Sequence, residues 1–76
     1  MNAHHPIQPM DPALNHLGRA EIIELLVELR AVSREFGLLW PSAKPGERAL
    51  DGRVLVNLGN VPVSTVINLL AVLREF

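Results

Sequence analysis

Residues 21–36, with the sequence EIIELLVELRAVSREF, carry the strongest structural signal in the chain. Their apolar side chains recur every three or four positions, which is the spacing of one face of an α-helix. The opposite stripe is acidic, and we interpret it as solvated because like charges at these spacings repel unless water screens them. The pattern predicts a long amphipathic helix ending at Gly37, since glycine is common just past a helix C-terminus. The apolar positions are Ile22, Leu25, Leu26, Leu29, Val32 and Phe36, and the acidic ones are Glu21, Glu24, Glu28 and Glu35.

The chain before this helix contains an earlier start signal. Asp11 and Pro12 are typical of a helix N-cap and a first helical residue, so a helix is expected to begin there. Gly18 is expected to separate a short first helix from the long one, because glycine costs about 1 kcal/mol relative to alanine inside a helix. Residues 1–10 contain two prolines and no periodicity, which predicts a flexible arm. Residues 11–76 would then form a single small domain.

The chain after Gly37 predicts a loop and then a hairpin. Residues 38–46 hold two prolines and are expected to form the loop. In residues 47–58, ERALDGRVLVNL, the pair Asp51-Gly52 suits a two-residue type I′ turn, which needs positive φ at both central positions. A helix through the same residues is the alternative, and Gly52 argues against it. The residues that alternate onto one face of the second strand are Val54, Val56 and Leu58.

A last helix is predicted from the region of Asn60 or Ser64, either of which could cap it, to about Glu75. It is apolar around most of its circumference, and such a helix is normally enclosed by other parts of a protein. One amphipathic helix and one hairpin offer too little chain to enclose it. We therefore expect a helix-dominated α+β fold that forms an intertwined or face-to-face dimer. The apolar positions are Val63, Val66, Ile67, Leu69, Leu70, Val72 and Leu73.

Composition supports the need for a partner. The chain has 76 residues, of which 49% are hydrophobic, and it contains no cysteine. Domains of this size usually rely on disulfides, a metal or oligomerisation, and the lack of cysteine removes the first of these. A net charge of −1 provides no electrostatic attraction to nucleic acid or anionic lipid. No signal peptide or stretch long enough to span a bilayer is recognisable, so a soluble cytoplasmic protein is expected.

The polar residues do not combine into a catalytic or metal-binding pattern. None of the hydroxyl residues, Ser33, Ser42, Ser64 and Thr65, lies in a nucleophile-elbow sequence. His4 and His5 are adjacent in the predicted arm, whereas a closed metal site needs about four ligands on a fixed frame. No phosphate-binding glycine pattern is present. We therefore expect no enzymatic activity, no cofactor and no metal.

Residues 58–70, LGNVPVSTVINLL, resemble the turn and recognition helix of helix-turn-helix regulators. Members of that class often contain Leu-Gly-Val-Ser, then Thr-Val, then spaced leucines. The resemblance implies a last helix that enters the DNA major groove. The side chains available there for phosphates and base edges would be Ser64, Thr65, Asn68 and Arg74.

These observations favour a small, non-enzymatic protein-interaction or assembly module. Its partner would be a second copy of itself or a larger protein, with no membrane involved. The alternative is a small dimeric helix-turn-helix-like regulator, for which the partner would be nucleic acid. The residues expected at the interface are Ile22, Leu25, Leu29, Val32, Phe36, Val54, Val56, Val66, Leu69, Leu70 and Leu73.

Overall fold

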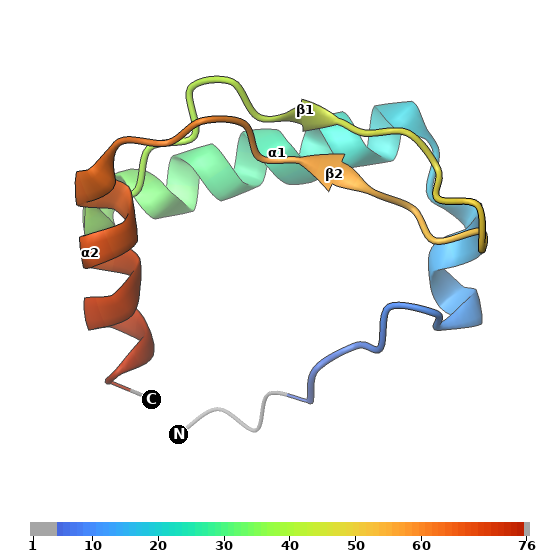
Figure 1. Cartoon of the computed structure of the whole chain (residues 1–76), viewed down its shortest axis with the longest axis horizontal. Helices are drawn as coiled ribbons and strands as arrows, with labels where there is room; N and C mark the ends of the chain where they lie inside the picture. Colours follow the sequence, from blue (N-terminus) through green and yellow to red (C-terminus); the bar gives the residue numbers. More distant parts are fainter. Residues whose placement is uncertain (1–4, 76) are drawn as a thin grey trace.

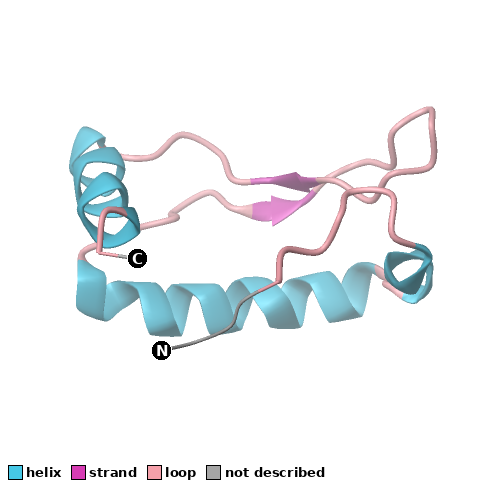
Figure 2. Cartoon of the chain, turned by 90° about the horizontal axis from the view of Figure 1, so that it is seen from below, coloured by secondary structure: helices cyan, strands magenta, loops and turns pink. Residues whose placement is uncertain are grey.

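The computed structural model describes residues 5–75 and has a helix-dominated α+β fold. In chain order the elements are η1 (Pro12–His16), α1 (Arg19–Ser33), η2 (Arg34–Phe36), β1 (Lys44–Pro45), β2 (Val56–Asn57) and α2 (Val63–Leu73). Figure 1 shows an arch in which α1 and the hairpin run along the top, while α2 and η1 descend at its two ends. Seen from below, the hairpin forms a second layer against one side of α1 (Figure 2). Within residues 5–75, no helix combines the length and apolar character needed to cross a membrane.

The N-terminal part follows the expected start signals. Asp11 caps η1, because its Oδ1 accepts a hydrogen bond of 2.9 Å from the backbone N–H of Ala13. Gly18 precedes α1 in an extended conformation, and its N–H donates to the Glu21 carboxylate at 2.7 Å. This contact satisfies a backbone donor that the helix itself leaves free. The predicted division at Gly18 is therefore confirmed, with the first helix a 3-10 helix. Residues 5–10 of the expected arm are exposed, and residues 1–4 lie outside the described residues.

Gly37 closes the α1–η2 segment as predicted. Its φ of 73° lies in the left-handed region, where a residue without Cβ is favoured. The N–H of Leu38 donates to the carbonyl of Ser33 at 3.1 Å, and the N–H of Gly37 donates to that of Arg34 at 3.2 Å. This pair of bonds is the Schellman arrangement, which uses carbonyls left free at the helix end.

The core is small and lies between α1 and the chain that returns over it. Ile22, Leu26 and Ala43 are buried together, and Leu29, Trp40 and Val54 pack against them half-buried. Polar side chains of α1 hold the returning segment in place. Arg30 donates to the carbonyl oxygens of Trp40 at 3.3 Å and Ala43 at 2.8 Å, and the Trp40 indole N–H donates to the Ser33 hydroxyl at 3.0 Å. The backbone groups of the loop are thus paired by residues of the helix it covers.

The hairpin exists, but its strands and turn differ from the prediction. β1 pairs antiparallel with β2, and β1 lies inside the segment expected to be a loop. Among the described residues only glycines have positive φ, so Asp51 cannot take part in a type I′ turn. Instead, the N–H of Gly52 donates to the Ala49 carbonyl and the N–H of Ala49 donates to the Arg53 carbonyl, both at 2.9 Å. This is a three-residue turn with glycine at its left-handed position, and it excludes the helical alternative for residues 47–58.

Asp51 stabilises the start of the returning strand. The backbone N–H of Arg53 donates to its Oδ1 at 3.1 Å, and the Arg53 guanidinium lies 2.9 Å from Oδ2. These hydrogen bonds lower the pKa of Asp51, the backbone bond contributing most. Both side chains are about half exposed, so their ion pair is screened by water.

Gly52→Ala is expected to lower the free energy of unfolding by roughly 1 kcal/mol, because a Cβ is strained at positive φ. The φ of Gly52 is 91°, and no described atom lies within 4 Å of the position its Cβ would take. The loss would therefore come from backbone strain rather than a clash. Urea unfolding at a fixed protein concentration measures it. Gly52→Asn serves as the control and should lose less, because asparagine tolerates this region. A gain in stability for Gly52→Ala would contradict the turn.

Candidate interaction surface

Thr65 sets the orientation of α2. Its side chain is 1% exposed, and its hydroxyl forms two hydrogen bonds with the backbone of Leu39. The Oγ1 accepts from the Leu39 N–H at 3.0 Å and donates to the Leu39 carbonyl at 3.2 Å. A single side chain thus pairs both backbone groups of a residue 26 positions earlier, in the way a neighbouring strand would.

Asn68, one turn further along α2, makes a second polar contact on the same side. Its Nδ2 donates to the Gly37 carbonyl at 3.0 Å. A Cβ on Gly37 would lie 2.5 Å from that Nδ2, so any larger residue there would displace the Asn68 amide as well as be strained at positive φ. Thr65 and Asn68 form the inner edge of α2, and Leu69 and Val72 flank it half-buried. The helix is therefore docked on the chain that follows α1 largely through hydrogen bonds.

The opposite side of α2 is apolar and exposed. At about 100° per residue, its five large aliphatic side chains occupy an arc of roughly 120° centred nearly opposite Thr65. They are between 46% and 74% exposed. We call this arc the outer face of α2, and it consists of Val63, Val66, Ile67, Leu70 and Leu73. Residues 63–73 contain no charged side chain, so the helix has no charged group that would make this side favourable in water.

The two residues expected to cap the last helix, Asn60 and Ser64, do not do so. The helix begins at Val63 after Pro62, and neither Asn60 nor Ser64 caps it with a side-chain hydrogen bond. The N–H of Asn60 instead donates to the Ser42 hydroxyl at 3.2 Å, which attaches the segment before α2 to the loop after α1. Capping satisfies free N–H groups only locally, whereas this bond and those of Thr65 connect distant parts of the chain.

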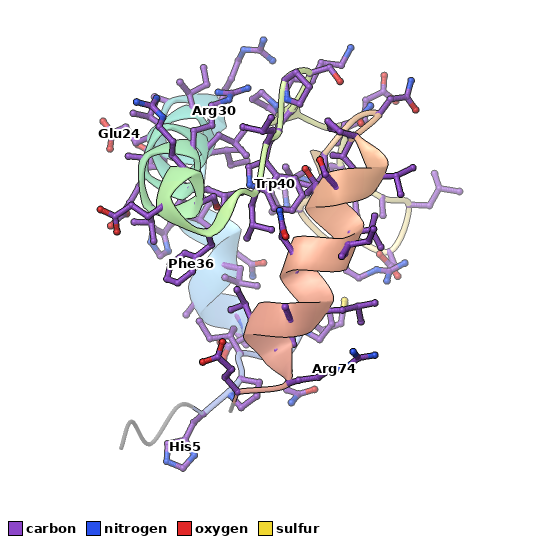
Figure 3. The ribbon with its side chains drawn as sticks, turned by 90° about the vertical axis from the view of Figure 1, so that its left-hand side faces the viewer. His5, Glu24, Arg30, Phe36, Trp40 and Arg74 are labelled. Carbon is purple, nitrogen blue, oxygen red and sulfur yellow. The ribbon has the colours of Figure 1, made fainter. Side chains whose placement is uncertain are left out.

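A second group of exposed apolar residues lies along α1 and η2. Leu25, Val32 and Phe36 fall within a narrow sector of the helical wheel and are each slightly more than half exposed. In Figure 3, Phe36 points downwards from the end of this segment, in the direction in which α2 runs. Glu24 points away from α2. The η2 end of this segment also contacts α2.

The structure separates the eleven predicted interface residues into four groups. Ile22 is buried in the chain's own core, and Leu29, Val54 and Leu69 are half-buried. Val56 is exposed on the hairpin. Val66, Leu70 and Leu73 come together on the outer face of α2, and Leu25, Val32 and Phe36 lie along the α1–η2 segment.

Two residues of the outer face, Val63 and Ile67, were not among the predicted interface residues. The sequence identified them as apolar, but the apolar pattern alone does not assign them to one side of a helix that is apolar nearly all round. The signal that could have found them is the position of Thr65 and Asn68. Taking these polar residues as the docked side would have placed the outer face opposite them.

Comparison with known protein families, with characterised proteins and with solved structures finds no match to this chain. The arrangement also differs from the helix-turn-helix that residues 58–70 resemble. That motif needs a helix before the turn, and β2 with its flanking loop lies there instead. Thr65 and Asn68 are directed into their own chain. In residues 5–75, no three His, Cys, Asp or Glu residues are grouped so that they could hold a metal ion.

Thr65→Val is expected to lower the free energy of unfolding by about 1–3 kcal/mol, because it leaves both backbone groups of Leu39 without the hydroxyl partner. Valine has nearly the same shape, so packing is retained. Thr65→Ser keeps the hydroxyl and is the matched control. Urea unfolding of the three proteins at one protein concentration compares them. Equal stability of Thr65→Val and the parent chain would show that these hydrogen bonds do not orient α2.

Proposed function

We propose that this protein is a non-enzymatic assembly module that binds another protein chain through the outer face of α2. The observation that carries the proposal is the inverted orientation of this helix. Its polar edge, Thr65 and Asn68, is turned towards its own chain, and its aliphatic arc is turned outwards. Contiguous exposed apolar surface of this kind marks protein-contact sites.

The hydrogen bonds of Thr65 argue against an alternative orientation of α2 in the same chain. A half-turn about its axis would bury the outer face but place aliphatic side chains against Leu39. The Leu39 N–H and carbonyl, whose hydrogen bonds are part-buried, would then lose their partner, at a cost of up to about 1–3 kcal/mol in total. The observed orientation pairs the backbone groups of Leu39 and leaves the outer face of α2 exposed for a partner.

The gain available from a partner is substantial. Burial of apolar surface contributes about 25 cal/mol per Å², and each of the five outer-face side chains retains close to half or more of its surface in solvent. An aliphatic contact of this kind needs no catalytic group, cofactor or metal. It also fits protein better than nucleic acid, because phosphate recognition relies on basic side chains and residues 63–73 have none.

Leu70→Glu is expected to abolish the assembly, because an unpaired charge in a desolvated interface costs several kcal/mol. The measurement is the native mass of the full-length chain, carrying a small tag and isolated gently from the cells that make it. The parent chain should be found in a complex of defined stoichiometry, heavier than its own 8.4 kDa. The Leu70→Glu chain should be found at its own mass with an unchanged helical circular-dichroism spectrum.

The matched control is Ser64→Glu, which places the same charge on an exposed side of α2 outside the outer face. It lies in the first turn, where a carboxylate is compatible with the helix dipole. The Ser64→Glu chain should keep the mass of the parent complex. Recovery of the parent chain at 8.4 kDa would contradict the proposed function, as would a complex that Leu70→Glu leaves intact.

A further inference from the structure

We infer that the occupant of the outer face is a second copy of this chain, so that two α2 helices pack face to face across a twofold axis. This inference rests on the proposed function and specifies its partner. Three features support it: the amount of surface that the single chain leaves in solvent, the lack of charge on the outer face, and the position of the acidic stripe.

The single chain exposes more surface than a compact monomer of its mass, and the excess is large enough to include a dimer interface. The chain exposes 6325 Å², whereas a folded monomer of its mass would expose about 4,600 Å². Its radius of gyration of 13.8 Å likewise exceeds the value of about 11 Å for a compact domain of this length. A stable interface needs roughly 800 Å² from each partner, which is about half of the excess. Residues 5–10, all of them exposed, account for part of the remainder.

The outer face is compatible with its own copy. In a twofold dimer the same patch meets itself, so any charge on it would meet a like charge near the axis. Residues 63–73 carry no charge, and the first charged residue beyond them is Arg74. Like-charge contact is one means by which proteins exclude a wrong partner. The outer face has no such device against self-association.

The acidic residues exclude the other long helix as the centre of this contact. Glu21, Glu24 and Glu28 lie on one exposed side of α1, where two copies would repel one another. Glu24 points away from α2 in Figure 3, so a contact through α2 leaves this stripe in water. Val63, Val66, Leu70 and Leu73 are spaced by three and four residues, as in the seam of paired helices.

Sedimentation equilibrium of the purified full chain tests the inference directly. The parent chain should sediment at twice its mass of 8.4 kDa in the micromolar range. Leu70→Glu should raise the dissociation constant of the dimer at least about a hundredfold, since several kcal/mol are lost and each 1.4 kcal/mol is a factor of ten. Ser64→Glu should leave it nearly unchanged. Because Leu70 is about half exposed in the single chain, its replacement should not unfold the protein.

Cross-linking then locates the contact. The chain has no cysteine, so Leu70→Cys and Ser64→Cys each introduce one thiol. A short bifunctional thiol reagent should join two Leu70→Cys chains in high yield and Ser64→Cys chains only at background. A dimer that Leu70→Glu does not weaken, or equal cross-linking of the two variants, would overturn the inference.

A purified chain that sediments as a folded monomer would also overturn the second copy as occupant. The proposed function would still stand if the native complex contains a different protein and is lost with Leu70→Glu. If both the purified and the native chain are monomeric, the inference and the proposed function fail together.

Discussion

The hydrogen bonds between the Thr65 hydroxyl and the backbone of Leu39 connect parts of the structure that are distant in sequence. Leu39 follows the end of the long helical segment, and Thr65 lies in the first turn of α2. Pairing them fixes both the direction in which α2 leaves α1 and the side that it shows to solvent. Asn68 and Gly37 make the same connection one turn later, with a second carbonyl as acceptor.

Polar side chains, rather than a large apolar core, hold this chain together. Arg30 and Ser33 attach the segment around Trp40 to α1, and Ser42 attaches the approach to α2. The buried apolar core is limited to a few residues of α1 and the segment after it. Each hydrogen bond contributes only about 1 kcal/mol net, so we expect the single chain to be marginally stable. Burial of the outer face by a partner would add stability through mass action, which would couple folding to assembly.

Hydrogen bonds hold the chain's own fold, and aliphatic side chains are left on the surface, which is compatible with the proposed assembly module. Directional hydrogen bonds restrict α2 to one orientation, so the aliphatic side chains that face outwards are already ordered in the single chain, as the proposed function requires. Contacts that are already ordered lose less conformational freedom on binding. In this arrangement the single chain is less stable than if the outer face of α2 were buried in it, but the outer face is held in a defined position.

Much of the local structure could be predicted from the sequence. The spacing of apolar residues identified the long helix, Gly37 marked its end, and Asp11 and Gly18 marked the starts of two helices. Gly52 indicated a reversal of the chain. The high aliphatic content, without cysteine, indicated a surplus of apolar surface. These signals are readable because each depends on neighbouring residues and on backbone geometry.

Tertiary structure decided the turn type, the place of the first strand and the orientation of α2. Asp51 has negative φ because the turn contains three residues, and β1 forms further upstream because its partner determines the register. A helix that is apolar nearly all round carries no periodic signal for its buried side. The buried side is fixed by the hydrogen bonds of Thr65 to the N–H and carbonyl of Leu39, 26 residues earlier. Which backbone groups meet Thr65 depends on the packing of the whole chain, and no local pattern encodes it.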